Sequence, residues 1–388
     1  MEFGWSTDER AHRQRIQDLL AEALPQDWEQ LAVHGPGSDF QTDYSKEFCK
    51  LLAAQGLLVP HWPKEHGGED APVWKQFILG EEMWAVGEPR GAQYMNVNWV
   101  GPVLMRFGTD DQLSRYLPPI REGRAIWCQG FSEPSAGSDL ASLRTAALPV
   151  DGGYRVTGAK VWTSYAGQAD YCFLLARVAA TEDGPTGKSA IVILLTDMSS
   201  PGIQVKGIPA LIGEGDIHEV FFDDVFVPAA DRLGAEGQAW EIITFALQNE
   251  RTGIARYEFS RRVLDRAVRR LIKEGRWKDP VVQDRAARAL MLCEAARMLV
   301  YRVVDAKANG LTVDAYSSIA RWAVIEADNG VNDFLTEFVP AGLRGDDPVQ
   351  QAHHQRAVSA GIASGAAEIQ LNLIARRWLD LPGEKHRQ

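Results

Sequence analysis

The sequence has no apolar run that approaches the roughly 20 residues needed by a membrane-spanning helix. It also has no leader pattern at its start, because Met1–Gln17 mixes Asp and Glu with Arg. A signal peptide would begin basic and continue apolar, and a transit peptide would be poor in acids. We therefore expect a cytoplasmic chain without a membrane partner.

The sequence also has fewer basic than acidic residues. Lys and Arg number 41 against 52 Asp and Glu, so the formal net charge is −11 at pH 7. A nucleic-acid partner would require a basic stripe, and none is expected here. The acidic balance still allows a phosphorylated small ligand held by a few local donors.

Paired cysteines and metal-ligand spacings are absent as well. No C-x-x-C pair occurs, and the eight histidines form no metal-binding spacing. We expect no metal site, and we expect reduced cysteines that serve in packing. These cysteines are Cys49, Cys128, Cys172 and Cys293.

The periodicity of apolar residues changes twice along the 388 residues, a length that suggests about two to three domains. Thr42–Gln55 has helical spacing, whereas Tyr171–Ala176 and Ala190–Leu195 are short apolar runs typical of buried strands. Helical spacing returns in the range 259–271. The pattern predicts an α+β multidomain chain. Its expected parts are an N-terminal helical domain over 1–124, a middle, barrel-like β-domain over 125–232 and a C-terminal helical bundle over 233–388.

Two short segments carry candidate binding chemistry. Ser132–Asp139 reads Ser-Glu-Pro-Ser-Ala-Gly-Ser-Asp, and its small residues would let the main chain approach a bulky ligand closely. Lys160–Ser164 places an aromatic plane and two hydroxyls at the end of a strand-like run. Each segment by itself is equally typical of ordinary structure, the first of a surface turn and the second of a packed core tryptophan.

Four segments in fixed order give a more specific signal. Leu57–Gly68, Ser132–Asp139, Lys160–Ser164 and Glu219–Pro228 together resemble the acyl-CoA dehydrogenase family over nearly the whole chain. The second, third and fourth match the family's TEP-x-AGSD loop, its K-x-W-I-T segment and its V-x-F-x-x-V-x-V-P strand. The resemblance implies the acyl-CoA dehydrogenase fold and an FAD cofactor.

The resemblance also implies the roles of the flavin contacts. Phe131 and Ser132 match residues whose main chain and hydroxyl hold the pyrimidine ring. Trp162 matches the tryptophan that covers the isoalloxazine, and Ser164 matches the hydroxyl near flavin N5. Thr163 lies between them and is also a cofactor-binding candidate. Ser132 and Ser164 stand where the family usually has threonine, and both keep the hydroxyl.

The catalytic base decides the chemistry, because a carboxylate must remove the α-proton of the thioester from a water-poor cleft. Family members often place it in an E-G-T-x-x-I-Q run, but Ser364 occupies that position here. The other placement is a helix glutamate directly before an arginine, which matches Glu250 and Arg251. We predict Glu250 as the base, with Ser138 and Arg251 as substrate-binding residues.

Two segments that homotetrameric family members donate to a neighbouring flavin site are not evident. The R-x-x-F-G region reads as Arg270–Pro280 here, and the Q-x-x-G-G-x-G region reads as Phe338–Gly345. The resemblance therefore favours a homologous partner subunit in an α2β2 heterotetramer, like the actinobacterial enzymes that oxidise steroid side-chain CoA esters. A homotetramer with divergent segments is the alternative.

The predicted reaction is FAD-dependent α,β-dehydrogenation of an acyl-CoA to its 2,3-trans-enoyl-CoA, with Glu250 removing the α-proton and hydride passing to flavin N5. A bulky steroid side-chain CoA ester is the expected substrate, and a branched- or long-chain fatty acyl-CoA is an alternative. The expected electron acceptor is an electron-transfer flavoprotein. A non-catalytic partner subunit and an oxygen-using flavin enzyme are the competing functions.

Overall fold

The computed structural model describes residues 4–178, 186–213, 215–251, 255–311, 313–363 and 365–382; the side chains of 248–251 and 314 lie outside this description. The chain forms two compact units. Unit 1 comprises Met1–Val33, Ala71–Gly87 and Arg251–Gln388, and unit 2 comprises His34–Asp70 and Glu88–Glu250.

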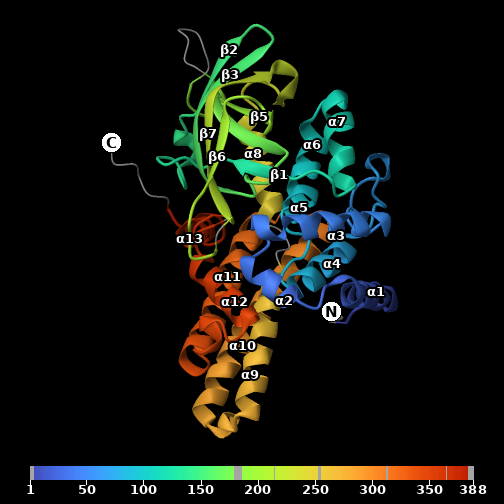
Figure 1. Cartoon of the computed structure of the whole chain (residues 1–388), viewed down its shortest axis with the longest axis vertical. Helices are drawn as coiled ribbons and strands as arrows, with labels where there is room; N and C mark the ends of the chain where they lie inside the picture. The colour runs from blue at the N-terminus through green and yellow to red at the C-terminus, as the bar shows by residue number, and fades with distance from the viewer. Residues whose placement is uncertain are drawn as a thin grey trace. The chain divides into compact units, whose positions relative to one another are not determined.

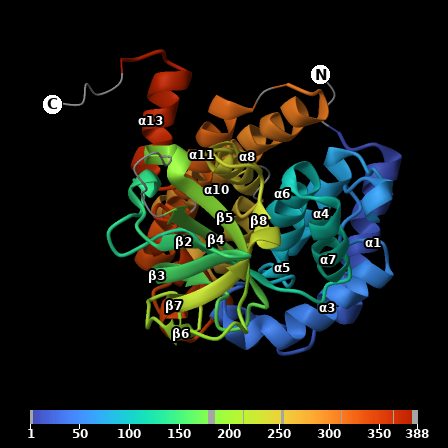
Figure 2. The same ribbon diagram turned by 90° about the horizontal axis from the view of Figure 1, so that it is seen from above.

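Unit 2 is built around an eight-stranded sheet, drawn in green to yellow in Figure 1. The strands run in the order β6-β7-β3-β2-β4-β5-β8, and β1 pairs in parallel with β4. Figure 2 shows β3 beside β7, its antiparallel partner. The strands are β1 Trp127–Gly130, β2 Ala146–Val150, β3 Gly153–Ser164, β4 Tyr171–Val178, β5 Ile191–Asp197, β6 Ile203–Gly207, β7 Ile217–Pro228 and β8 Arg232–Leu233.

The centre of this sheet is apolar on both faces. Cys172–Ala176 of β4 and Ile191–Thr196 of β5 are all buried, as expected for continuous apolar runs in a covered sheet. Helices complete unit 2, and α7 begins with a capping box between Thr109 and Gln112. The main helices are α3 Thr42–Ala54, α5 Gln93–Met95, α6 Gly101–Phe107, α7 Asp110–Arg121 and α8 Ala239–Arg251, with a π-helix at Asn96–Val100 and short 3-10 turns at Asp39–Gln41 and Lys64–His66.

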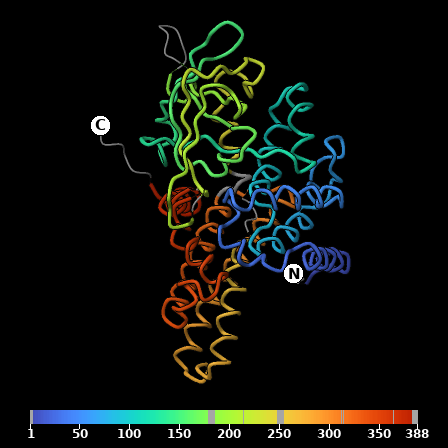
Figure 3. Tube along the Cα trace, in the orientation of Figure 1, coloured from blue at the N-terminus to red at the C-terminus, as the bar shows by residue number. Residues whose placement is uncertain are grey.

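Unit 1 is helical. Its long helices α9 and α10 run side by side, as the orange part of the trace in Figure 3 shows. Asp279 caps α10 by accepting a hydrogen bond from Val281 N, and Pro280 occupies the first turn. The helices are α1 Thr7–Ala23, α2 Trp28–Leu31, α4 Val73–Ala85, α9 Tyr257–Lys273, α10 Pro280–Ala308, α11 Asp314–Phe338, α12 Pro348–Ser359 and α13 Ala367–Arg377.

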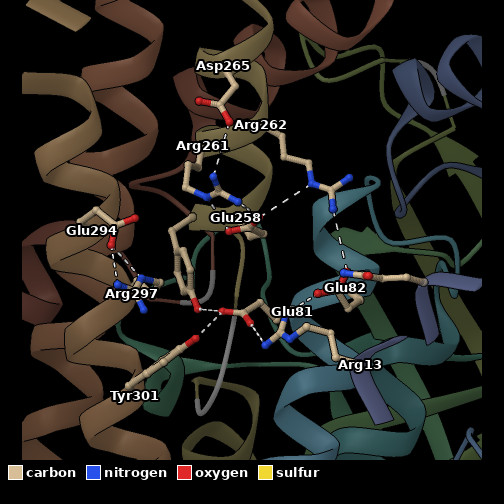
Figure 4. A network of polar contacts seen from close by, with 12 residues as sticks. Arg13, Glu81, Glu82, Glu258, Arg261, Arg262, Asp265, Glu294, Arg297 and Tyr301 are labelled. Atoms are coloured by element: carbon tan, nitrogen blue, oxygen red, sulfur yellow. Dashed lines mark hydrogen bonds and ion pairs between the residues drawn. The ribbon is translucent and has the colours of Figure 1, made fainter. Parts of the chain in front are cut away.

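A buried cluster of acids ties the helices of unit 1 together (Figure 4). Arg13 on α1 forms ion pairs with Glu81 and Glu82 on α4. The hydroxyls of Tyr257 and Tyr301 donate to Glu81 Oε1 over 2.6 and 3.1 Å. Every partner in this cluster is a neighbouring side chain of the same unit, so the cluster has a structural explanation.

The α+β prediction is confirmed, with helices first, a β-region in the middle and helices last. All four cysteines are buried and carry free thiols, as the sequence predicted. Within the described ranges, none of the helices combines the length and the apolar character that crossing a bilayer requires.

Candidate functional site

The end of strand β3 is the most unusual part of unit 2. Trp162 has a left-handed backbone with φ of 60°, and it lies inside a register shift between Lys160 and Thr163 in the pairing of β3 with β7. Such a conformation costs a non-glycine residue about 1–3 kcal/mol and clusters at functional sites. Although it is a tryptophan, Trp162 is 60% exposed. The strand thus presents an indole plane on which a flat ring could stack.

The loop that follows β1 lies against this strand end. Ser132 accepts a main-chain hydrogen bond from Val161 N over 2.9 Å. Glu133 and Ala136 exchange two main-chain bonds of 2.9 and 3.0 Å, which close the loop into a tight turn. The first predicted loop and the predicted tryptophan segment are therefore adjacent in space. Ser138, two residues after this turn, is exposed.

A buried ion pair locks this loop to β3. Lys160 is fully buried, and its Nζ donates to Phe131 O over 3.1 Å and to Glu133 Oε1 over 2.8 Å. Glu133 also accepts from the backbone N–H groups of Arg144 and Thr145 over 2.6 and 2.8 Å. Buried charges of this kind must be paired, and here every bond draws two segments together.

The ionisation of the pair follows from its surroundings. Burial alone would raise the pKa of the Glu133 carboxyl, but the bond and charge of Lys160, with the bonds from Thr145, hold that pKa below its ordinary value. Burial lowers the pKa of Lys160, and Glu133 limits the decrease. The sequence analysis did not predict this pair, although Glu133 lies in the Ser132–Asp139 segment and Lys160 begins the Lys160–Ser164 segment. A lysine inside a strand-like run indicates a buried acidic partner, and this feature could have identified the pair.

The other predicted cofactor residues differ in accessibility. The Phe131 side chain is buried, 6.3 Å from the ring of Trp99 and 6.0 Å from that of Phe173 between centroids, so only its main chain is available to a ligand. Ser132 and Ser164 are half-buried. The Thr163 hydroxyl is buried and has no hydrogen-bond partner among the described residues. Its cofactor role stays a prediction.

The predicted base lies at the end of α8. The helix is fixed within unit 2 by buried Ile242, Ile243 and Ala246, and Phe245 packs edge-on against Phe107 of α6 at 5.6 Å between ring centroids. The side chains of Glu250 and Arg251 lie outside the described residues, as does Ser364. Their predicted roles are therefore not tested by the geometry.

Comparison with known proteins identifies this architecture. Models of the acyl-CoA dehydrogenase N-terminal, middle and C-terminal domains match residues 6–124, 128–225 and 237–379. The acyl-CoA dehydrogenase IpdE1 of Mycobacterium tuberculosis is 31% identical over 383 residues, which cover 97% of this chain and 99% of IpdE1. The acyl-CoA dehydrogenase FadE34 of the same organism is 35% identical over 85% of this chain, which spans about half of FadE34 (45%).

Solved structures agree with these relatives. The "Tcur3481-Tcur3483 steroid ACAD" superposes with a TM-score of 0.91 at 26% identity, covering 99% of this chain and all of that chain. A chain of the ChsE4-ChsE5 complex from Mycobacterium tuberculosis gives a TM-score of 0.88 at 25% identity, with coverage of 99% and 100%. The chain therefore belongs to the acyl-CoA dehydrogenase family of flavin-dependent oxidoreductases.

Proposed function

We propose that this chain is a catalytic subunit of an FAD-dependent acyl-CoA dehydrogenase. The exposed, left-handed Trp162 beside the Ser132 loop carries the proposal, because a strained and exposed aromatic has no evident packing role. Family membership supplies the reaction class, dehydrogenation across Cα–Cβ of an acyl-CoA thioester. We keep the three-domain division at 1–124, 125–232 and 233–388 as part of the proposal.

The residues present fit a flavin. The indole of Trp162 would cover the isoalloxazine, and the main chain of Phe131 with the partly exposed hydroxyl of Ser132 would hold the pyrimidine edge. Ser164 and Thr163 would contribute at the strand end. When bound, FAD supplies the acceptor for the hydride that leaves Cβ.

Glu250 would remove the α-proton, with Arg251 beside it and Ser138 near the pantetheine–pyrophosphate arm. A carboxylate is needed because the α-proton is weakly acidic and must be transferred by a positioned base. Ser364 stands where many relatives carry their glutamate, and serine cannot take this role. The purified complex of this chain with its partner subunit, loaded with FAD, should convert an acyl-CoA to its 2,3-enoyl-CoA with an artificial electron acceptor. Bound FAD without any enoyl-CoA product would contradict the catalytic proposal.

We propose a bulky steroid side-chain CoA ester as substrate. The steroid ACAD with a TM-score of 0.91 supports this choice, and so does the sequence, which has the small Ser364 where many relatives carry their catalytic glutamate. The decisive assay compares CoA thioesters of steroid side chains, isovalerate and straight chains. Preference for the steroid thioester is expected, and exclusive turnover of short straight chains would refute it.

We also propose a homologous partner subunit in an α2β2 heterotetramer, with an electron-transfer flavoprotein as acceptor. The two regions in which homotetrameric relatives carry their flavin-donating segments lack those motifs here, and they contact each other, since Arg276 Nη1 donates to Phe338 O over 2.8 Å. The ChsE4-ChsE5 complex is a related assembly of two different chains. Full flavin loading and activity from this chain alone would contradict the heteromer, and rapid reoxidation by air would favour an oxygen-using enzyme.

A further inference from the structure

A buried histidine lies beside the end of β3, next to the residue that follows Trp162. His218 is on β7 and is 3% exposed. Its Nδ1 is 3.2 Å from the carbonyl oxygen of Thr163, and its Nε2 is 3.1 Å from Oδ2 of Asp39. Both ring nitrogens thus face oxygen atoms that only accept hydrogen bonds. A neutral imidazole donates from one nitrogen alone, so this arrangement selects the doubly protonated imidazolium.

The charges around the ring favour the same form. Asp39 Oδ1 is buried and lacks a hydrogen-bond partner in the described part of the chain, so the imidazolium is the nearest compensation for its charge. Asp216, also buried, adds a second negative charge facing the ring. Burial alone would lower the pKa of His218, but the bond and charge of Asp39, the Thr163 carbonyl and Asp216 raise it above its ordinary value.

The pair is closely packed against the turn that follows β3. A Cβ added at Gly167 would lie 2.2 Å from Asp39 Oδ2 and 2.8 Å from His218 Nε2, so only glycine fits there. Asp39 N also donates to Gly215 O over 3.0 Å. His218 therefore joins β7 to two segments that are distant in sequence, one at residue 39 and one at residues 163–167.

Thr163, whose carbonyl oxygen His218 contacts, lies between the proposed flavin contacts Trp162 and Ser164. Thr163 follows the left-handed Trp162 and precedes Ser164, and Tyr165 is again left-handed with φ of 68°. Backbone strain of this kind persists only where the surroundings fix it. We propose that His218 is a positioning residue for FAD: its imidazolium, held by Asp39, fixes the Thr163 carbonyl and with it Trp162 and Ser164. This inference rests on the proposed flavin site.

A pH dependence of FAD binding follows from the proposal. A histidine whose pKa is raised in the folded state contributes its full stabilisation below the unfolded pKa of about 6.5. The contribution is lost as the pH rises through the raised folded value. Because the imidazolium holds the Thr163 carbonyl and with it the flavin contacts Trp162 and Ser164, FAD affinity should be highest near pH 6 and fall on the alkaline side, as His218 loses its proton.

The test is a titration of the full chain, in the preparation that binds FAD, with flavin fluorescence as the readout between pH 6 and 8.5. His218→Gln should weaken FAD about 10-fold at pH 6, the equivalent of one lost charge-assisted bond, and should remove the pH dependence. Asp39→Asn keeps the shape and should move the alkaline decrease to lower pH. His12→Gln on α1, whose ring contacts Lys75 O, is the matched control and should bind as wild type.

The outcomes separate the two proposals. If the wild-type chain binds no FAD at any pH, even together with its partner subunit, the proposed function fails. If wild type binds FAD with flat affinity across this range, and His218→Gln binds equally well, only the role of His218 is overturned. Circular dichroism and thermal melts of the FAD-free variants check folding. Should His218→Gln fail to fold, a flat profile or an unshifted midpoint in Asp39→Asn would still overturn the inference.

Discussion

A buried acid–base cluster of unit 1 and one of unit 2 are alike in their burial and differ in what surrounds them. In unit 1, Arg13 pairs with Glu81 and Glu82. In unit 2, Lys160 pairs with Glu133. The strand pairing shifts register directly after Lys160, where Trp162 has a left-handed backbone and an exposed indole. The comparison teaches that buried ion pairs alone do not indicate a site. What distinguishes the proposed flavin site is the exposed, left-handed Trp162 beside its ion pair.

Lys160→Met should have the largest effect on stability. It leaves the Glu133 carboxylate buried without its cation, and breaking such a pair costs about 3–5 kcal/mol. Urea unfolding at pH 7 measures this loss. The penalty should shrink in acid, because an unpaired buried Glu133 has a raised pKa and becomes neutral as the pH falls below it. FAD binding should be lost as well, and retained binding would show that the ion pair does not support the site.

Arg13→Met tests the other cluster. Glu81 keeps its bonds from Tyr257 and Tyr301, so we expect a smaller loss of about 2–3 kcal/mol in the free energy of unfolding. FAD affinity, measured in the same preparation by fluorescence, should not change. A fall in FAD affinity comparable with that of Lys160→Met would erase the distinction between the two clusters.

Trp162→Gly should have the smallest effect on stability and a clear one on binding. Glycine accepts φ of 60° without strain, and an exposed indole loses little packing, so the FAD-free protein should change by no more than about 1 kcal/mol. FAD affinity should fall about 10-fold or more, since aromatic stacking is worth roughly 1–3 kcal/mol. Phe226→Gly on β7 is the control, and it should lose stability while keeping FAD affinity.

The sequence predicted elements better than it predicted the contacts between them. The apolar run from Tyr171 and the helix from Thr42 begin where they were expected, because local periodicity determines them. The start of helix α10 at Pro280 depends instead on the Asp279 cap and on the proline in the first turn. Periodicity does not register such a cap.

The site was predicted through family resemblance, and its physical support was not. The positive φ of Trp162 could not be predicted from its residue type, because glycine is the residue that commonly adopts this conformation. Lys160 and Glu133 are far enough apart that only the fold brings them together. His218 was missed for the same reason, because its partners Thr163 and Asp39 are 55 and 179 residues away in the chain.

The measurement that tests the proposed chemistry most directly is turnover by Glu250→Gln, with Glu241→Gln on the same helix as the matched control. Losing a positioned general base should lower kcat by about 10²–10⁴-fold, while FAD affinity stays that of wild type. Glu241→Gln should retain full turnover. Near-normal turnover by Glu250→Gln would contradict the assignment of Glu250 as the base.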